Sequence, residues 1–100
     1  MNINWTNEAL QEIKAIYNYY KFRVSIKVAE SIKRKILSST KDLDKHARKG
    51  QSERLLTHKI DEYRYIIAGN YKVIYKICEK EVFIMKVFDC RRNPEIIEKM

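Results

Sequence analysis

The segment EYRYIIAGNYKVIYKI, from Glu62 to Ile77, sets basic side chains among aromatic ones on what reads as two short strands. It contains Arg64, Lys72 and Lys76 together with four tyrosines. Lysines and arginines in such a cluster can bind phosphates or acidic protein segments. The tyrosines could stack on nucleic-acid bases, but their positions also fit half-buried sites in a sheet, so we assign most of them to packing.

Positive charge is in excess over the whole chain. Twenty-one Lys and Arg oppose thirteen Asp and Glu, which gives a formal net charge of +8 on 100 residues. This balance favours a polyanion or an acidic protein as partner. Arg91 and Arg92 follow the last apolar run, and further cations load the middle of the chain: Lys27, Lys33, Arg34, Lys35, Lys41, Lys45, Arg48 and Lys49. Taken singly, most of these fit the solvated face of a helix.

Other chemistries have little support in the sequence. Cys78 and Cys90 lie twelve residues apart with no Cys or His at metal-ligand spacing, so we expect reduced thiols and neither metal nor cofactor. His46 and His58 fall in connecting segments without such neighbours. Two glycines in the whole chain cannot build a phosphate-binding loop, which disfavours a nucleotide-hydrolysing enzyme.

The lengths of the apolar runs and the N-terminal residues bear on where in the cell the protein acts. The longest apolar runs, such as Val82 to Met85, are far shorter than the roughly 20 residues that cross a bilayer. No signal-peptide pattern precedes Trp5. We therefore expect a cytoplasmic protein that contacts no membrane.

The first forty residues predict one strand and two helices. Ile3 and Trp5 alternate with polar residues, as in a strand, and apolar residues then recur every three or four positions over 7–20 and again from Ser25 to Ser39. Thr6 or Asn7 can cap the first helix and Ser25 the second, and the two should pack as a hairpin. The aperiodic, charged segment 40–51 predicts a surface connector anchored by Leu43.

The second half of the chain predicts strands. Gly69-Asn70 offers two positions that tolerate positive φ, so a two-residue turn should pair Ala68 with Tyr71 and Ile67 with Lys72. Arg64 and Lys72 then lie on opposite faces of this β-hairpin.

Two more strands complete the prediction. The nearly continuous apolar run 82–88 should lie inside the sheet with neighbours on both edges. The run 54–56, RLL, is the candidate for a further, short strand. The chain is long enough for one core, so we predict a single α+β domain over residues 1–100. In it, an N-terminal strand and a two-helix hairpin pack on a small, mostly antiparallel sheet.

This order of elements resembles the RelE/ParE superfamily of bacterial type II toxins, and the resemblance covers the whole chain. Its most specific part is YRYIIAGNYKVIYKI followed by VFIMKVFDCRRNP, which is similar to the family's pattern of Tyr-Arg, a Gly-containing turn, Tyr-Arg/Lys-x-x-Tyr, an apolar strand and a closing Arg. The family's first helix is matched loosely by Ala9, Ile13 and Tyr17.

The resemblance implies two possible targets. Toxins of the RelE branch cut messenger RNA in the ribosomal A site, whereas those of the ParE branch inhibit DNA gyrase and are not nucleases. An RNA-cleaving site needs cations to stabilise the phosphate and a group that transfers a proton. Carried over by position, the candidate catalytic cations of a nuclease are Arg64, Lys72 and Arg91, and the candidate target-binding residues are Lys72, Arg91 and Arg92.

Departures from the RelE pattern favour the ParE branch. The strand before the turn has Ile66, Ile67 and Ala68 where RelE-like nucleases carry more cations, and residues 93–100 contain neither Tyr nor His. We therefore expect a gyrase-directed toxin without nuclease activity. A ribosome-dependent nuclease and a non-toxic basic module that binds nucleic acid remain the alternatives.

The resemblance also implies a protein partner. An acidic antitoxin should neutralise the toxin by wrapping over the helices and the sheet, with Arg64, Lys72 and Arg91 among the covered residues, as a toxin–antitoxin hetero-oligomer. Arg91 and Arg92 also have a purely structural alternative, because both can form surface ion pairs with Asp89 and Glu95 that take no part in binding.

Overall fold

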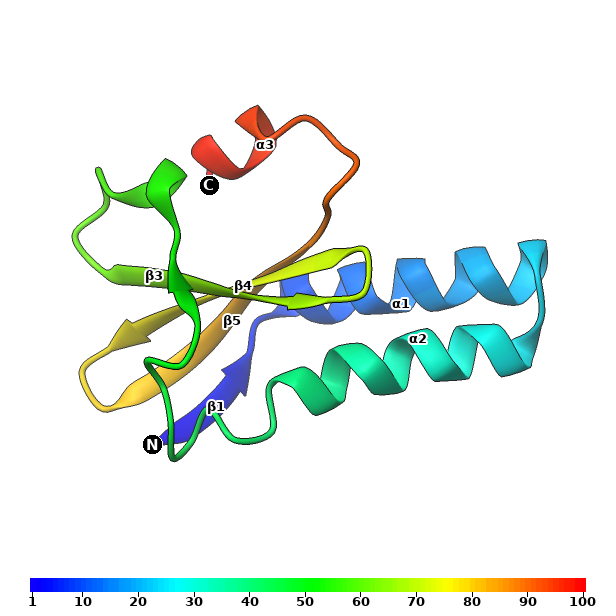
Figure 1. The fold of residues 1–100 in the computed structure, drawn as a ribbon, viewed down its shortest axis with the longest axis horizontal. Coiled ribbons are helices and arrows are strands. Elements are labelled where there is room, and N and C mark those ends of the chain that lie inside the picture. The colour runs from blue at the N-terminus through cyan, green and yellow to red at the C-terminus, as the bar shows by residue number, and fades with distance from the viewer.

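The computed structural model describes all residues from Met1 to Met100 and confirms the α+β architecture. The elements follow the chain as β1 (Asn2–Trp5), α1 (Asn7–Arg23), α2 (Ile26–Ser39), β2 (Gln51–Ser52), the 3-10 helix η1 (Arg54–Leu56), β3 (Glu62–Ala68), β4 (Tyr71–Cys78), β5 (Glu81–Asp89) and α3 (Glu95–Glu98). Figure 1 shows the long α1–α2 hairpin on one side of the sheet and α3 with η1 on the other. None of the helices combines the length and the apolar character needed to span a membrane.

The five strands form one sheet in the order β1-β5-β4-β3-β2. β1 runs parallel to β5, and all other neighbours are antiparallel. The predicted turn pairing is confirmed, since Ala68 lies opposite Tyr71 and Ile67 opposite Lys72. The central place of β5, between β1 and β4, is confirmed too.

Helix boundaries follow from capping residues. The Thr6 hydroxyl accepts a hydrogen bond from the Ala9 N–H at 3.2 Å, and the Ser25 hydroxyl accepts one from Val28 at 3.1 Å, which identifies the predicted caps. α1 continues three residues beyond the predicted end at Tyr20, because no Gly or Pro stops it. Only Val24 and Ser25 join the two helices, so they must run antiparallel.

One local prediction was wrong. The segment 54–56 is a 3-10 turn and not a strand, because the Glu53 carboxylate accepts the Leu55 N–H and closes a turn there. Gln51 and Ser52 pair with β3 in its place. At the β3–β4 turn only Gly69 takes positive φ, at 63°, whereas Asn70 does not.

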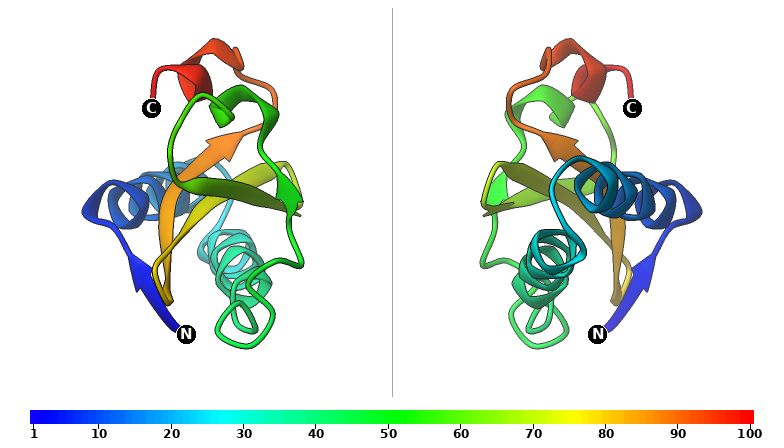
Figure 2. Two further views of the ribbon diagram at one scale, coloured as in Figure 1. Left: turned by 90° about the vertical axis from the view of Figure 1, so that its left-hand side faces the viewer. Right: turned by 90° about the vertical axis from the view of Figure 1, so that its right-hand side faces the viewer.

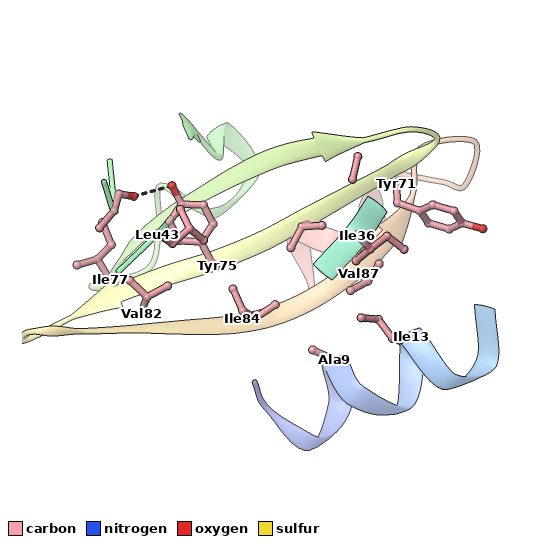
Figure 3. Close-up of a cluster of buried hydrophobic side chains, with 13 residues drawn as sticks. Ala9, Ile13, Ile36, Leu43, Tyr71, Tyr75, Ile77, Val82, Ile84 and Val87 are labelled. Carbon is pink, nitrogen blue, oxygen red and sulfur yellow. Dashed lines mark hydrogen bonds between the residues drawn. The ribbon is translucent and has the colours of Figure 1, made fainter. Parts of the chain in front are cut away.

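The main core lies between the helical hairpin and one face of the sheet (Figure 3). Ile84 is fully buried there among residues of α1 and β4, and Leu43 anchors the connector as predicted. A β-bulge in β5 shifts the register so that Tyr75 lies opposite Ile84 but Ile74 lies opposite Lys86. The bulge explains why Val87, and not Lys86, continues the inward face of this strand.

A second, smaller core covers the other face of the sheet. Its buried members are Leu56, Ile74, Phe88 and Ile97. Ile97 belongs to α3, a short helix that the sequence did not predict, and it is 1% exposed. Figure 2 shows α3 and η1 together above the sheet. The segment after β5 is therefore partly a structural cover and not a free tail.

Candidate functional site

Lys72 lies on β4, on the face of the sheet covered by the second core. Its Nζ is 2.6 Å from Glu53 Oε2, and the Glu53 side chain is only 3% exposed. The ammonium also sits 4.1 Å from the centroid of the Tyr65 ring, a cation–π contact. The charge of Lys72 is therefore already balanced by a buried carboxylate within the chain.

Arg64 lies on β3, on the opposite face from Lys72. Its guanidinium donates to Glu62 Oε2 at 2.6 Å and to the Gly50 carbonyl at 2.7 Å. These bonds tie β3 to the end of the connector. Arg64 is the main cause that holds the pKa of Glu62 below its usual value, and Arg48 adds to the effect.

Arg91 follows β5 in a turn and has a largely exposed side chain. It is held by Asp89, with Nη2 at 2.7 Å from Oδ2 and Nε at 2.9 Å from Oδ1. The bidentate pair lowers the pKa of Asp89. Arg92 is exposed and makes no ion pair. The structural alternative, a surface ion pair within the chain, is therefore found for Arg91 and not for Arg92.

The three candidate cations of a nuclease therefore do not form one constellation. Arg64 and Lys72 lie on opposite faces of the sheet, and Arg91 lies beyond the end of β5. Each is engaged by a carboxylate of the same chain. The sequence predicted the opposite faces correctly. It did not indicate Glu53 as the partner of Lys72, because η1, β3 and the β3–β4 turn separate the two residues along the chain.

A groove of about 380 Å³ lies beside Arg91, between α1 and the end of β5. Its lining comes from both elements and from the start of β4: Glu12, Ala15, Ile16, Tyr19, Tyr71, Val87, Asp89, Arg91 and Arg92. Beyond Ile84 no strand pairs with the outer edge of β5, and the Val87 N–H donates instead to Glu12 Oε1 at 2.9 Å. The groove therefore combines an apolar wall with two arginines at a partly open sheet edge.

The groove is lined by no histidine, and its two carboxylates are already engaged, Glu12 by Lys86 and Asp89 by Arg91. Burial raises the pKa of Tyr71, and the hydroxyl of Tyr20, 3.4 Å away, raises it further. His46 and His58 are exposed in the connector and after η1, outside the lining of the groove. No three His, Cys, Asp or Glu side chains come together as a metal-binding group.

The unbalanced charge lies elsewhere, between the middle of α1 and the start of the connector. Residues 14–41 contain eight cations and one acid, so this segment carries +7 of the formal +8. All eight side chains are exposed, and none has a carboxylate within ion-pair distance. The sequence already showed this concentration of cations, but only the structure shows that they stay unpaired.

Comparison with known proteins bears on the family. A model of the ParE toxin of type II toxin–antitoxin systems, parDE, matches residues 3–94. A solved structure of the chromosomal ParDE toxin–antitoxin system from P. aeruginosa is similar in fold, with a TM-score of 0.74 and 20% sequence identity over 89% of this chain and 95% of that chain. No curated protein sequence matches the chain. Because the family model spans most of the sequence, the chain belongs to the ParE toxin family of type II toxin–antitoxin systems.

Proposed function

We propose that this ParE-like toxin inhibits DNA gyrase by binding it and does not cleave RNA. One observation carries the proposal: Arg64, Lys72 and Arg91 are held in three separate ion pairs, on two faces and beyond one end of the sheet. Cleavage next to a ribose 2′-hydroxyl needs cations and a proton-transferring group within reach of one phosphate. The separation of these cations supports a binding function instead.

The proposed antitoxin site is the groove between α1 and the end of β5. An acidic segment that folds on binding can place carboxylates near Arg92, which has no partner, and apolar side chains against Ile16 and Tyr19. Arg91 can exchange Asp89 for a partner's carboxylate because its side chain is 63% exposed. Lys72 and Arg64 contribute less to such a site, since their carboxylate partners are buried or half-buried.

The experiment compares two activities of the purified protein. We expect inhibition of supercoiling by gyrase and intact message in a ribosome-dependent cleavage assay. Changing Arg91→Ala together with Arg92→Ala should reduce gyrase inhibition without unfolding the domain, because both side chains are exposed. Lys80→Ala is the matched control, since Lys80 is an exposed cation without an ion pair in the β4–β5 turn.

Cleavage of ribosome-bound message, lost on Lys72→Ala or Arg91→Ala in a protein that stays folded, would assign the chain to the nuclease branch. Salt-dependent binding of nucleic acid without growth arrest would instead support a non-toxic basic module.

A further inference from the structure

The tip of the helical hairpin exposes three large apolar side chains. Phe22 at the end of α1 is 82% exposed, Val24 in the link is 61% exposed, and Ile26 at the start of α2 is 56% exposed. None of the three belongs to either core of the molecule. Figure 1 shows this tip projecting past the β3–β4 turn, clear of the sheet.

The same tip is purely cationic. From Tyr19 to Lys27 the sequence has Lys21, Arg23 and Lys27 and no acid. Lys21 and Arg23 lie in the last turn of α1, where the helix dipole favours cations. Lys27 lies in the first turn of α2, where the dipole disfavours a cation and no acid accompanies it. Local helix stability therefore does not explain Lys27.

We propose that this tip inserts into an apolar pocket rimmed by carboxylates on the protein that the toxin inhibits. The chemistry of the tip defines the pocket, since Phe22 needs an apolar cavity and the three cations need acidic neighbours around it. The inference rests on the proposed function, because it assigns the tip to gyrase as target.

The shape of the tip favours the target over the antitoxin as the partner of the tip. A projecting knob fits a concave site on a folded protein, whereas a segment that folds on binding needs a groove such as the one beside Arg91. A second copy of this chain is disfavoured, because two tips would bring like charges together. Nucleic acid would satisfy the cations but would leave Phe22, Val24 and Ile26 without an apolar partner.

The test measures binding of purified gyrase holoenzyme and growth arrest on expression. Phe22→Ser should weaken gyrase binding by about 30-fold, as expected for a central aromatic contact of an interface. Lys27→Glu should weaken it by about 5-fold to 10-fold at low salt, with the difference shrinking as salt rises. Lys27→Glu also places an acid at a helix N-terminus, so loss of folding cannot explain its effect.

Ile60→Ser is the matched control. Ile60 is fully exposed between η1 and β3, so this change removes a similar side chain at a distance from the tip and should leave binding within about 2-fold of the wild type. Phe22→Ser with unchanged gyrase binding and unchanged growth arrest would overturn the inference. So would wild-type binding to anionic lipid vesicles or duplex DNA, in place of gyrase, that depends on Phe22.

The outcomes separate this inference from the proposed function. If the wild type arrests growth without binding gyrase, the proposed target is wrong, and the tip is then judged by whether Phe22→Ser abolishes the arrest. If the wild type and Phe22→Ser bind gyrase equally, the inference about the tip is wrong and the proposed function stands. A wild type that neither arrests growth nor binds gyrase overturns both.

Discussion

The sheet and the helical hairpin use their cations in different ways. Every cation in an ion pair lies between residues 48 and 91, on the strands and the segments that flank them. Lys72, the least exposed cation on β4, faces Glu53, and Lys86 on β5 faces Glu12 at 2.8 Å. The hairpin has seven cations, from Lys14 to Lys35, and none of them forms an ion pair. The charges of the sheet therefore stabilise the fold, whereas those of the hairpin remain available to partners.

The contrast in packing predicts the largest difference in stability. Ile84→Ala should lower the free energy of unfolding by about 2 to 5 kcal/mol, because Ile84 is fully buried in the main core. Val24→Ala, at the exposed tip of the hairpin, should change it by less than about 0.5 kcal/mol. Urea unfolding of both variants measures the difference. An unchanged midpoint for Ile84→Ala would show that β5 is not the centre of the core.

The ion pair of Lys72 should matter for folding more than for recognition. Lys72→Met leaves the carboxylate of Glu53 buried without a cation. We expect the free energy of unfolding to fall by about 2 to 3 kcal/mol, which is less than for a fully buried pair because Lys72 is partly exposed.

A double variant separates the two roles. Lys72→Met combined with Glu53→Gln removes the uncompensated charge and keeps an oxygen for the Leu55 N–H, so it should recover part of the stability. Urea midpoints of the two single variants and the double variant give the coupling energy. If Lys72→Met is as stable as the wild type, Lys72 is not needed for folding and is available to bind the target.

Tyr75 tests how the connector is held on the sheet. Its buried hydroxyl donates to the Ala47 carbonyl at 2.6 Å and accepts from the Gly50 N–H at 3.1 Å. The dashed line at the Tyr75 hydroxyl in Figure 3 marks the first of these bonds. Tyr75→Phe leaves both backbone groups without this partner and should cost about 1 to 3 kcal/mol. Tyr65→Phe is the control, because the Tyr65 hydroxyl donates to the exposed Gln51 side chain. Equal thermal midpoints for the two variants would contradict this anchoring role.

Acid should weaken the sheet slightly. Glu62 and Asp89 have folded pKa values below their unfolded values, so their contribution to stability is present above about pH 4 and is lost as the pH falls through the folded pKa. Glu62→Gln should therefore make the urea midpoint less dependent on pH below about 4. If the variant and the wild type lost stability in parallel, Arg64 would not be stabilising the sheet through Glu62.

Local sequence determined much of this fold. The register of the β3–β4 hairpin follows from Gly69-Asn70, and the helix starts follow from Thr6 and Ser25, because turns and caps depend on hydrogen bonds between residues a few positions apart. The family pattern from Tyr63 to Asn93 could be recognised for the same reason, since it consists of residues close together along the chain. The 3-10 turn at Arg54 was missed because it depends on the Glu53 side chain and not on periodicity.

The sequence predicts only part of the candidate site. The sequence by itself determined that Arg64 and Lys72 lie on opposite faces and that cations are concentrated in the middle of the chain, since strand alternation and composition are local properties. Only the tertiary structure decided that Glu53 neutralises Lys72, that Glu12 covers the open edge of β5 and that Phe22 stays uncovered. Ion pairing and burial depend on residues that are distant along the chain, and folding alone brings them together or keeps them apart.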